Sequence, residues 1–294
     1  MKRFALILLV VLICASLCSC DTILKKAKSY VTGTEDVPPP KDYIATLENE
    51  QFSYEVYEEY IKLIKYVGDL KEITIPSEID EKPVAVIGSL CFFDTSTDVT
   101  SVEIPSSVTT IEESAFYYAD ELTSIRIPDS VTKIGARAFA WCNALETVSI
   151  GSGITEIPEY CFNHCVSLNT IVIPPNVTKF GARAFSFCSG MTELEVPSVV
   201  ESVDELAFKG CSSLEFITFH NDLITLGANI FSDCGKVVVI ANEGSNAKEY
   251  CKEYALRWST SKDIEAVVLG PDEESAGDSD QYRKNNLRRL FLRK

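Results

Sequence analysis

Apolar residues recur along this chain at a fixed spacing over many copies. The first apolar position of each copy lies 23 residues from the next, at Val99, Leu122, Leu145, Leu168, Met191, Leu214 and Val237. An earlier copy begins at Leu70 and is longer, with 29 residues before Val99. A fixed period of this length predicts a solenoid, in which each unit covers the apolar face of its neighbour.

Each unit divides into three segments, as the sequence LTSIRIPDSVTKIGARAFAWCNA of residues 122–144 shows. The initial pattern L-x-x-I-x-I predicts a β-strand, which ends at Pro128 because proline has no N–H to donate to a neighbouring strand. A second extended stretch follows and ends at Gly135, which permits a tight bend. The apolar residues of the third segment share one side of a predicted short helical turn: Ala138, Phe139 and Cys142.

The complete phrase, with Ile-Pro after the strand and Ala-Phe-x-x-Cys at the end, resembles the BspA-type leucine-rich repeat family. The resemblance extends from Leu70 to about Cys251. It implies a repeat solenoid with one β-strand and one short helical turn in each 23-residue unit, capped at both ends. Local departures affect single turns and leave the expected fold unchanged: Ile150-Gly151 for Ile-Pro, Pro158 for Gly, and His220 after Phe219.

The segments outside the repeat complete the expected organisation. Alternating apolar residues after Phe52 predict a hairpin that caps the open end of the solenoid, since terminal repeats must cover the exposed core. Residues 243–258 have the three- and four-residue apolar spacing of a helix and predict a second cap. The expected domains are a signal peptide (1–19), a lipidated N-terminus and flexible tether (20–50), an N-terminal cap (51–69), the repeats (70–236), a C-terminal cap (237–262) and an acidic then basic tail (263–294).

The first twenty residues have the pattern of an export signal. A basic start precedes an apolar run of fifteen residues, from Phe4 to Cys18. A membrane-spanning helix needs about 20 apolar residues, so an export signal fits this run better.

The end of this run, LCSC at residues 17–20, resembles the lipobox of bacterial lipoproteins. The resemblance implies lipid attachment at Cys20. The mature protein would then be exported and anchored to the outer face of the cytoplasmic membrane or to the cell surface of a bacterium. An ordinary secretory signal or an uncleaved anchor is the alternative interpretation.

The chain is acidic, with a formal net charge of −16 and a pI near 4.6. A nucleic-acid surface needs clustered Lys and Arg, so this charge argues against nucleic acid as a partner. The charge changes sign near the end of the chain, where residues 272–280 are acidic and 283–294 are basic. We expect a disordered tail; a short basic amphipathic helix that contacts anionic lipid or wall polymer is the alternative.

Five of the eleven cysteines occupy one position of the repeat: Cys142, Cys165, Cys188, Cys211 and Cys234. Facing residues on successive coils lie about 4.8 Å apart, within the disulfide range of about 4.4–6.8 Å between Cα atoms. Geometry therefore permits bridges. An earlier copy has Ala119 at this position, which indicates a small apolar filler, so we expect packed free thiols.

The sequence predicts neither a metal site nor an enzyme. Cys161, His164 and Cys165 are metal-ligating residue types, but both cysteines occupy core positions of the repeat and no second pair of ligands lies nearby. The nucleophile-elbow, P-loop, HExxH and dinucleotide-binding motifs are absent from the sequence. No cofactor is therefore expected, although the many carboxylates leave a paired-acid site open.

Two surfaces are candidates for ligand binding. The position before the repeated cysteine has a ring in four consecutive copies, at Tyr118, Trp141, His164 and Phe187, with Tyr117 beside the first. The next two copies have Gly210 and Asp233 there, so the core does not require a ring. The alternative surface is the outward face of the strands, whose side chains are small or charged: Glu103, Arg126, Ser149, Thr170 and Glu193.

The resemblance and the expected anchor together predict a non-catalytic cell-surface lipoprotein that binds a macromolecule. BspA-type proteins are associated with adhesion to host or microbial surface components, so the implied partner is a protein or glycan at such a surface. One alternative is a structural or scaffold protein of the envelope without an external ligand. Another is an accessory part of a surface enzyme complex.

Overall fold

The computed structural model describes residues 42–93 and 99–262. The chain divides into two compact units, Met1–Tyr43 and Ile44–Lys294. Nearly all of the first unit lies outside the described residues, as do the expected signal peptide, Cys20 and the basic tail. The second unit contains the repeats and forms a β-solenoid.

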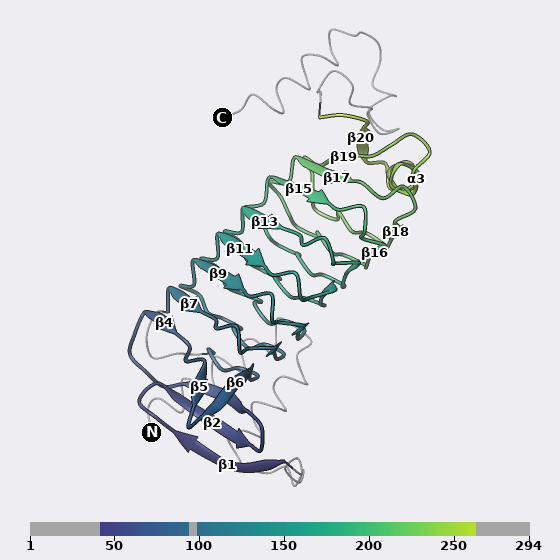
Figure 1. The fold of residues 1–294 in the computed structure, drawn as a ribbon. Helices are drawn as coiled ribbons and strands as arrows, with labels where there is room; N and C mark the ends of the chain where they lie inside the picture. The colour runs from purple at the N-terminus through teal and green to yellow at the C-terminus, as the bar shows by residue number, and fades with distance from the viewer. Residues whose placement is uncertain (1–41, 94–98, 263–294) are drawn as a thin grey trace, which may run out of the picture. The chain divides into compact units, whose positions relative to one another are not determined.

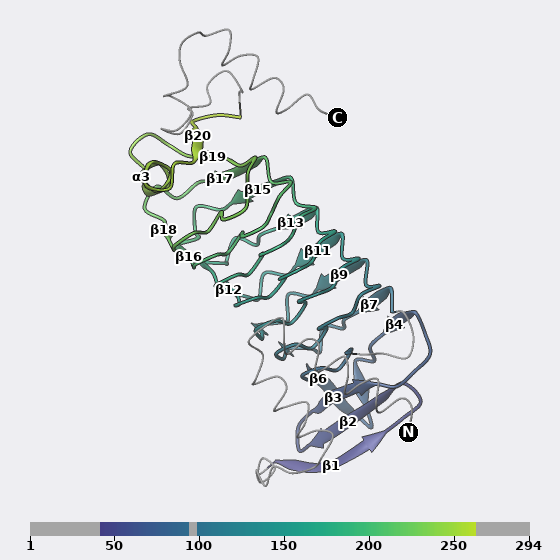
Figure 2. The ribbon, with the colours of Figure 1, turned by 180° about the vertical axis from the view of Figure 1, so that it is seen from behind.

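Strands of successive coils pair in parallel on one side of this solenoid (Figures 1 and 2). They are β4 (Glu72–Thr74), β7 (Ser101–Glu103), β9 (Ser124–Ile127), β11 (Thr147–Ile150), β13 (Thr170–Val172), β15 (Glu193–Val196), β17 (Phe216–Phe219), β19 (Val238–Ile240) and β20 (Arg257–Ser259). The first five form one sheet and the last four another. Residues 23 apart lie side by side, so that Val148 pairs with both Ile125 and Ile171. We call the outward side of these two sheets the strand face.

A second row of short strands runs along another side. It comprises β6 (Lys82–Ile87), β8 (Thr110–Ile111), β10 (Lys133–Ile134), β12 (Glu156–Ile157), β14 (Lys179–Phe180), β16 (Ser202–Val203) and β18 (Thr225–Leu226). This row is divided between β10 and β12. In the other coils the residue after the strand donates its N–H to the preceding coil, as Gly135 does to Ile111 and Gly181 to Ile157, both at 2.8 Å. Pro158 has no N–H, so this bond is lost where the row divides.

The third side has turns in place of the expected short helical turn. Alternate N–H groups donate to the next coil: Arg137 to Glu159 and Phe139 to Cys161 at 3.0 Å, and Trp141 to Asn163 at 2.7 Å. The same three bonds recur from the coil of residues 114–118 to that of residues 206–210, with N–O distances of 2.6 to 3.1 Å. We call this continuous set the hydrogen-bond spine, and the outside of these turns the turn face.

A column of buried phenylalanines fills the core behind the spine. Its members are Phe92, Phe116, Phe139, Phe162, Phe185, Phe208 and Phe231. Consecutive rings are stacked, with centroids 4.6 to 5.8 Å apart. The register of the coils therefore places the same repeat position of successive coils side by side, so that the phenylalanine ring of each unit covers that of its neighbour.

The repeated cysteines pack beside this column and do more than fill space. Each thiol donates to a phenylalanine carbonyl of the preceding coil, as Cys165 does to Phe139 with 3.1 Å between Sγ and O. The other four make the corresponding bond at 3.0 to 3.2 Å. The expected apolar filler is thus also a weak hydrogen-bond donor, which alanine cannot replace.

Three strands precede the first coil. They are β1 (Tyr43–Glu48), β2 (Phe52–Tyr57) and β3 (Ile61–Tyr66). β3 pairs in parallel with β6, the first strand of the second row. The β2–β3 pair is an antiparallel hairpin whose Phe52, Ile61 and Leu63 are buried. β1 lies in the segment that we expected to be a tether, so ordered structure begins earlier in the chain than the sequence pattern indicates. A further short strand, β5 (Glu78–Ile79), pairs with β6.

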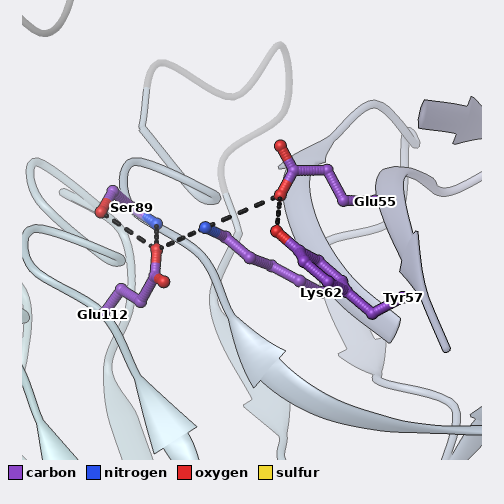
Figure 3. A network of polar contacts seen from close by, with 5 residues as sticks. All are labelled: Glu55, Tyr57, Lys62, Ser89 and Glu112. Atoms are coloured by element: carbon purple, nitrogen blue, oxygen red, sulfur yellow. Dashed lines mark hydrogen bonds and ion pairs between the residues drawn. The ribbon is translucent and has the colours of Figure 1, made fainter. Parts of the chain in front are cut away.

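A polar network joins the hairpin to the first coils (Figure 3). Nζ of Lys62 lies 3.0 Å from Oε2 of Glu112 and 3.7 Å from Oε2 of Glu55. The backbone N–H of Ser89 donates to the same oxygen of Glu112 at 3.0 Å, and the Tyr57 hydroxyl donates to Glu55 at 2.8 Å. The lysine thus links a carboxylate of the hairpin to a carboxylate of the solenoid.

The opposite end is closed by α3 (Asn246–Glu253) and β20. Ser245 caps the helix by accepting the N–H of Lys248, and Ala247, Tyr250 and Cys251 face the core. The helix is shorter than the expected span of 243–258, because residue 255 has a positive φ of 53° and the chain then joins the sheet.

We predict that the eight cysteines of the described residues are reduced. All are buried and free, and burial raises the pKa of thiols such as Cys142 and Cys188. Alkylation without reductant should therefore be slow in the folded protein and complete at all eight after denaturation, as peptide mass spectrometry can measure. Cysteines that stay unmodified until a reductant is added would contradict this prediction.

Candidate ligand-binding surfaces

The rings at Tyr118, Trp141, His164 and Phe187 form a continuous stack on the turn face, which we call the ring column. Consecutive centroids lie 5.3, 3.9 and 4.4 Å apart, with interplanar angles of 5°, 5° and 27°. The structure thus brings together all four residues that the sequence singled out. All four are half-buried. Because the faces cover one another, the column presents ring edges and polar tips on its outer side.

The backbone at every position of the ring column is left-handed. The φ angles are 59° at Tyr118, 65° at Trp141, 60° at His164 and 63° at Phe187. This conformation costs an L-residue about 1–2 kcal/mol and is rare for bulky side chains. It is also what turns the N–H of each residue toward the next coil in the spine. The fold therefore requires a positive φ here and disfavours large residues.

Gly210 and Asp233 continue the same position in the next two coils, with φ angles of 73° and 64°. Glycine and aspartate are among the residues that adopt this conformation most readily. A Cβ atom added at Gly210 would lie 2.5 Å from Cδ1 of Phe187, so the last ring of the column extends over the glycine. The glycine thus provides space for the ring that ends the column.

His164 is the polar member of the column. Its Nδ1 lies 2.7 Å from Oδ1 of Asn163, a buried side chain. An amide oxygen only accepts, so Nδ1 carries the proton and Nε2 is left as an acceptor. Burial between Trp141 and Phe187 lowers the pKa of His164, which keeps the ring neutral at pH 7.

Two neighbours modify the ends of the column. Tyr117, which the sequence placed beside the first ring, is only 8% exposed and packs edge-on against Tyr118 at 4.9 Å. It therefore supports the column and offers little contact area of its own. At the other end, Nζ of Lys209 lies 5.9 Å from the Phe187 ring centroid.

The five candidates on the strand face are all exposed, but the structure separates them. Glu103, Arg126 and Ser149 are consecutive partners in the five-stranded sheet, and Thr170 is in the neighbouring row of that sheet. Glu193 belongs to the four-stranded sheet. Its carboxylate is paired with Lys262 at 2.9 Å, so it is already engaged within the chain.

Comparison with known proteins decides the family. The model of the BspA type leucine rich repeat region matches in six copies, over residues 62–192 and 181–267. The chain belongs to this family. No curated protein matches it.

Three solved structures are similar to this BspA-type chain. A leucine-rich repeat protein from Eubacterium ventriosum is 25% identical with a TM-score of 0.57, and the match covers 66% of this chain and half of that one. A leucine rich repeat protein of T. pallidum is 24% identical, with a TM-score of 0.48 and coverage of 68% and 83%. A leucine rich cell surface protein from Faecalibacterium prausnitzii is 21% identical, with a TM-score of 0.42 and coverage of 70% and 78%.

These findings place the BspA-type chain among repeat proteins of the bacterial surface type, which serve as interaction scaffolds. Within residues 42–93 and 99–262, His, Cys, Asp and Glu side chains form no group of three that could hold a metal ion. The same residues contain no helix long and apolar enough to cross a membrane.

The positive φ of the ring positions does not follow from the apolar pattern of the repeat. Glycine and aspartate at the same repeat position indicate more than tolerance of a missing ring, because they are residues that the left-handed backbone favours. Each coil has another left-handed position four residues before the ring position. In the last coil it is occupied by Asn229, with φ of 55°, and asparagine also adopts this conformation readily. The recurrence of Gly, Asn and Asp in late copies could have revealed both positions.

We predict that Gly210→Ala destabilises the protein by about 1–3 kcal/mol, because a Cβ is added both at a positive φ and against Phe187. The matched control is Asp233→Ala, one coil further at the same position, which should cost about 0.5 kcal/mol or less. Thermal and urea unfolding measure both. Equal losses would contradict the close approach of Phe187.

Proposed function

We propose that this BspA-type protein is a non-catalytic, lipid-anchored surface protein that binds a macromolecule through the ring column on its turn face. Lipidation would occur at Cys20, which lies outside the described residues. The lipid would hold the protein at the outer face of a bacterial membrane or at the cell surface. The partner would be a protein or glycan exposed on a host or microbial surface.

The observation that carries this proposal is the presence of rings where the backbone disfavours them. Four consecutive coils place a bulky aromatic residue or histidine at a positive φ, although Gly210 and Asp233 fill the same position further along. Strained residues that persist at neighbouring positions are typical of functional sites. Stacking with the neighbouring rings offsets part of the cost, by about 0.5–1.5 kcal/mol per pair.

The geometry of the column also limits the chemistry of the partner. Ring faces are covered by neighbouring rings, so flat stacking of a sugar on Trp141 or His164 is not supported. Ring edges carry partial positive charge and favour oxygen acceptors. A partner with exposed carbonyl, carboxylate or hydroxyl oxygens fits such an edge, and Nε2 of His164 adds one acceptor for a donor group.

We predict that Cys20 carries the lipid. Metabolic labelling with a fatty-acid probe should mark the wild-type protein and leave Cys20→Ala unlabelled, because the lipobox-like LCSC has Cys20 as its acceptor. The labelled band can be followed by gel fluorescence. Cys18→Ala is the matched control, since it removes a neighbouring cysteine and keeps the acceptor. Equal labelling of wild type and Cys20→Ala would contradict lipidation there.

We also predict that the triple variant Tyr118→Ser, Trp141→Gly, Phe187→Ser weakens adhesion at least tenfold, or about 1.4 kcal/mol. Its melting temperature should stay within a few degrees, because the rings are only half-buried and glycine at position 141 adopts the left-handed conformation without strain, which offsets part of the lost stacking. Binding of purified protein to whole host cells, immobilised matrix proteins and glycan arrays measures the change.

The matched control carries three substitutions on the strand face: Arg126→Ala, Ser149→Ala and Thr170→Ala. If adhesion falls in this control and persists in the ring variant, the strand face is the binding surface. Unfolding of the ring variant with retained adhesion at low temperature would show that the rings serve packing alone. A wild-type protein that binds none of these probes would favour a scaffold role in the envelope.

A further inference from the structure

A second column of large side chains lies on the turn face, four residues before the ring column in each coil. Its members are Arg137, Tyr160 and Arg183, with φ angles of 59°, 56° and 54°. All three are half-buried. Like the rings, these are bulky residues at positions whose left-handed backbone disfavours them. We call them the Arg–Tyr column.

The two columns carry large side chains in the same coils. The three pairs, each from one coil, are Arg137 with Trp141, Tyr160 with His164, and Arg183 with Phe187. In the next two coils both positions change together, to Leu206 with Gly210 and to Asn229 with Asp233. Between the columns the chain is buried, as Phe139 and Ala140 are. The six side chains therefore form one surface, which we call the three-coil patch.

The Arg–Tyr column presents two guanidinium groups. Cζ of Arg137 lies 4.7 Å from the ring centroid of Tyr160, and Cζ of Arg183 lies 5.4 Å from it. Arg183 also donates to the Tyr160 hydroxyl. Arg137 forms a long ion pair with Glu113, at 3.6 Å, and Arg183 forms none within the described part of the chain. Each guanidinium has five N–H donors, so these contacts orient the groups and leave donors for a ligand.

Carboxylates border the other side of the Arg–Tyr column. Glu159 and Glu205 are exposed, and each directly precedes a position of this column. In chain order they lie on the side away from the ring column. They repel an acidic ligand there, so a ligand carboxylate is favoured on the side of the arginines that faces the rings.

The spacing of the arginines indicates the conformation of such a ligand. Arg137 and Arg183 are two coils apart, or about 9.6 Å. In a polyproline II helix, side chains three residues apart share one face and lie about 9.3 Å apart. Side chains on one face of a β-strand lie about 6.6 or 13 Å apart and do not match. The arginines therefore fit acidic side chains at every third residue of a polyproline II segment.

The ring column fits the same conformation. A polyproline II segment leaves its backbone carbonyls unpaired, and aromatic surfaces are a common docking site for it. The ring edges favour those carbonyl oxygens, and Nε2 of His164 can accept an N–H. Neighbouring rings cover the faces of Trp141 and His164, which does not support sugar stacking. Both columns thus favour a protein segment over a glycan.

We propose that the three-coil patch binds a polyproline II segment of a partner protein that carries Asp or Glu at every third residue. Arg137 and Arg183 pair with two successive carboxylates, and the ring column contacts the backbone between them. This inference rests on the proposed function, because it names the partner that the ring column contacts. The acidic remainder of the chain repels acidic segments whose carboxylates miss the arginines.

Fluorescence anisotropy of labelled peptides with the purified full chain tests the inference. The probe has four Glu-Pro-Pro triplets, which adopt polyproline II and place the carboxylates on one face. One control has Gln for each Glu, and a second has four Glu-Pro-Pro-Pro units, whose carboxylates turn away from a single face. The probe should bind at least tenfold more tightly than either control. Polygalacturonate, an acidic glycan, should bind no better than the controls.

The double variant Arg137→Gln, Arg183→Gln should weaken binding of the probe at least tenfold and leave binding of the Gln peptide unchanged. The matched control is Arg126→Gln, Lys133→Gln, which removes two exposed cations elsewhere and should leave both affinities unchanged. Circular dichroism reports the folding of each variant. Arg137→Lys, Arg183→Lys keeps the charge and loses the paired donors, so its affinity for the probe should fall between the other two.

Binding of the probe that persists in the Arg137→Gln, Arg183→Gln variant would overturn the inference. So would equal binding of the two Glu peptides, preferential binding of polygalacturonate, or no binding of any peptide. The proposed function fails separately, if the ring variant of Tyr118, Trp141 and Phe187 retains adhesion to cells. If that adhesion is lost but no peptide binds the wild-type chain, the ring column remains the binding surface and only the acidic polyproline II partner is excluded.

Discussion

The hydrogen-bond spine on the turn side is the interaction on which the rest of this structure depends. Each row of strands is divided once, between β10 and β12 on one side and between β13 and β15 on the other. The spine continues through both divisions, with Phe139 bonded to Cys161 and Phe185 bonded to Ala207. Coils whose strands are not paired are therefore still held in register, and the phenylalanine and cysteine columns behind the spine stay aligned.

The spine imposes a conformational constraint on the surface that covers it. Two residues in each coil adopt a positive φ, such as Arg137 and Trp141, so that their N–H groups face the next coil. Side chains at these positions project outward in columns. The inner positions of the turn are buried, so only these columns can vary in chemistry without disturbing the core. In this chain one column carries the stacked rings, and the other carries Arg137 and Arg183 on either side of the Tyr160 ring.

The ends of the solenoid decide which of its other surfaces stay open. At the N-terminal end the β2–β3 hairpin continues the second row of strands, and Lys62 ties it to the first coils through Glu55 and Glu112. At the C-terminal end α3 and β20 cover the last core residues, and the side chain of Lys262 pairs with Glu193 and Glu195 on β15. At each end, buried apolar residues cover the core, and ion pairs of one lysine with two glutamates lie outside this apolar contact.

The sequence by itself determined the solenoid, the 23-residue register and the buried columns, because a fixed apolar period admits one way for each unit to cover the next. It also indicated the candidate ring positions, since recurrence at one repeat position places residues such as Trp141 and His164 side by side. Backbone conformation was decided only by the tertiary structure: a positive φ at Trp141 is stable only because Asn163 of the next coil accepts its N–H. The same holds for the ring faces, which stacking between coils covers, and for Lys262, which meets Glu193 across 69 residues of sequence. The contact between Lys262 and Glu193 joins residues with no common pattern, so no local periodicity could reveal it.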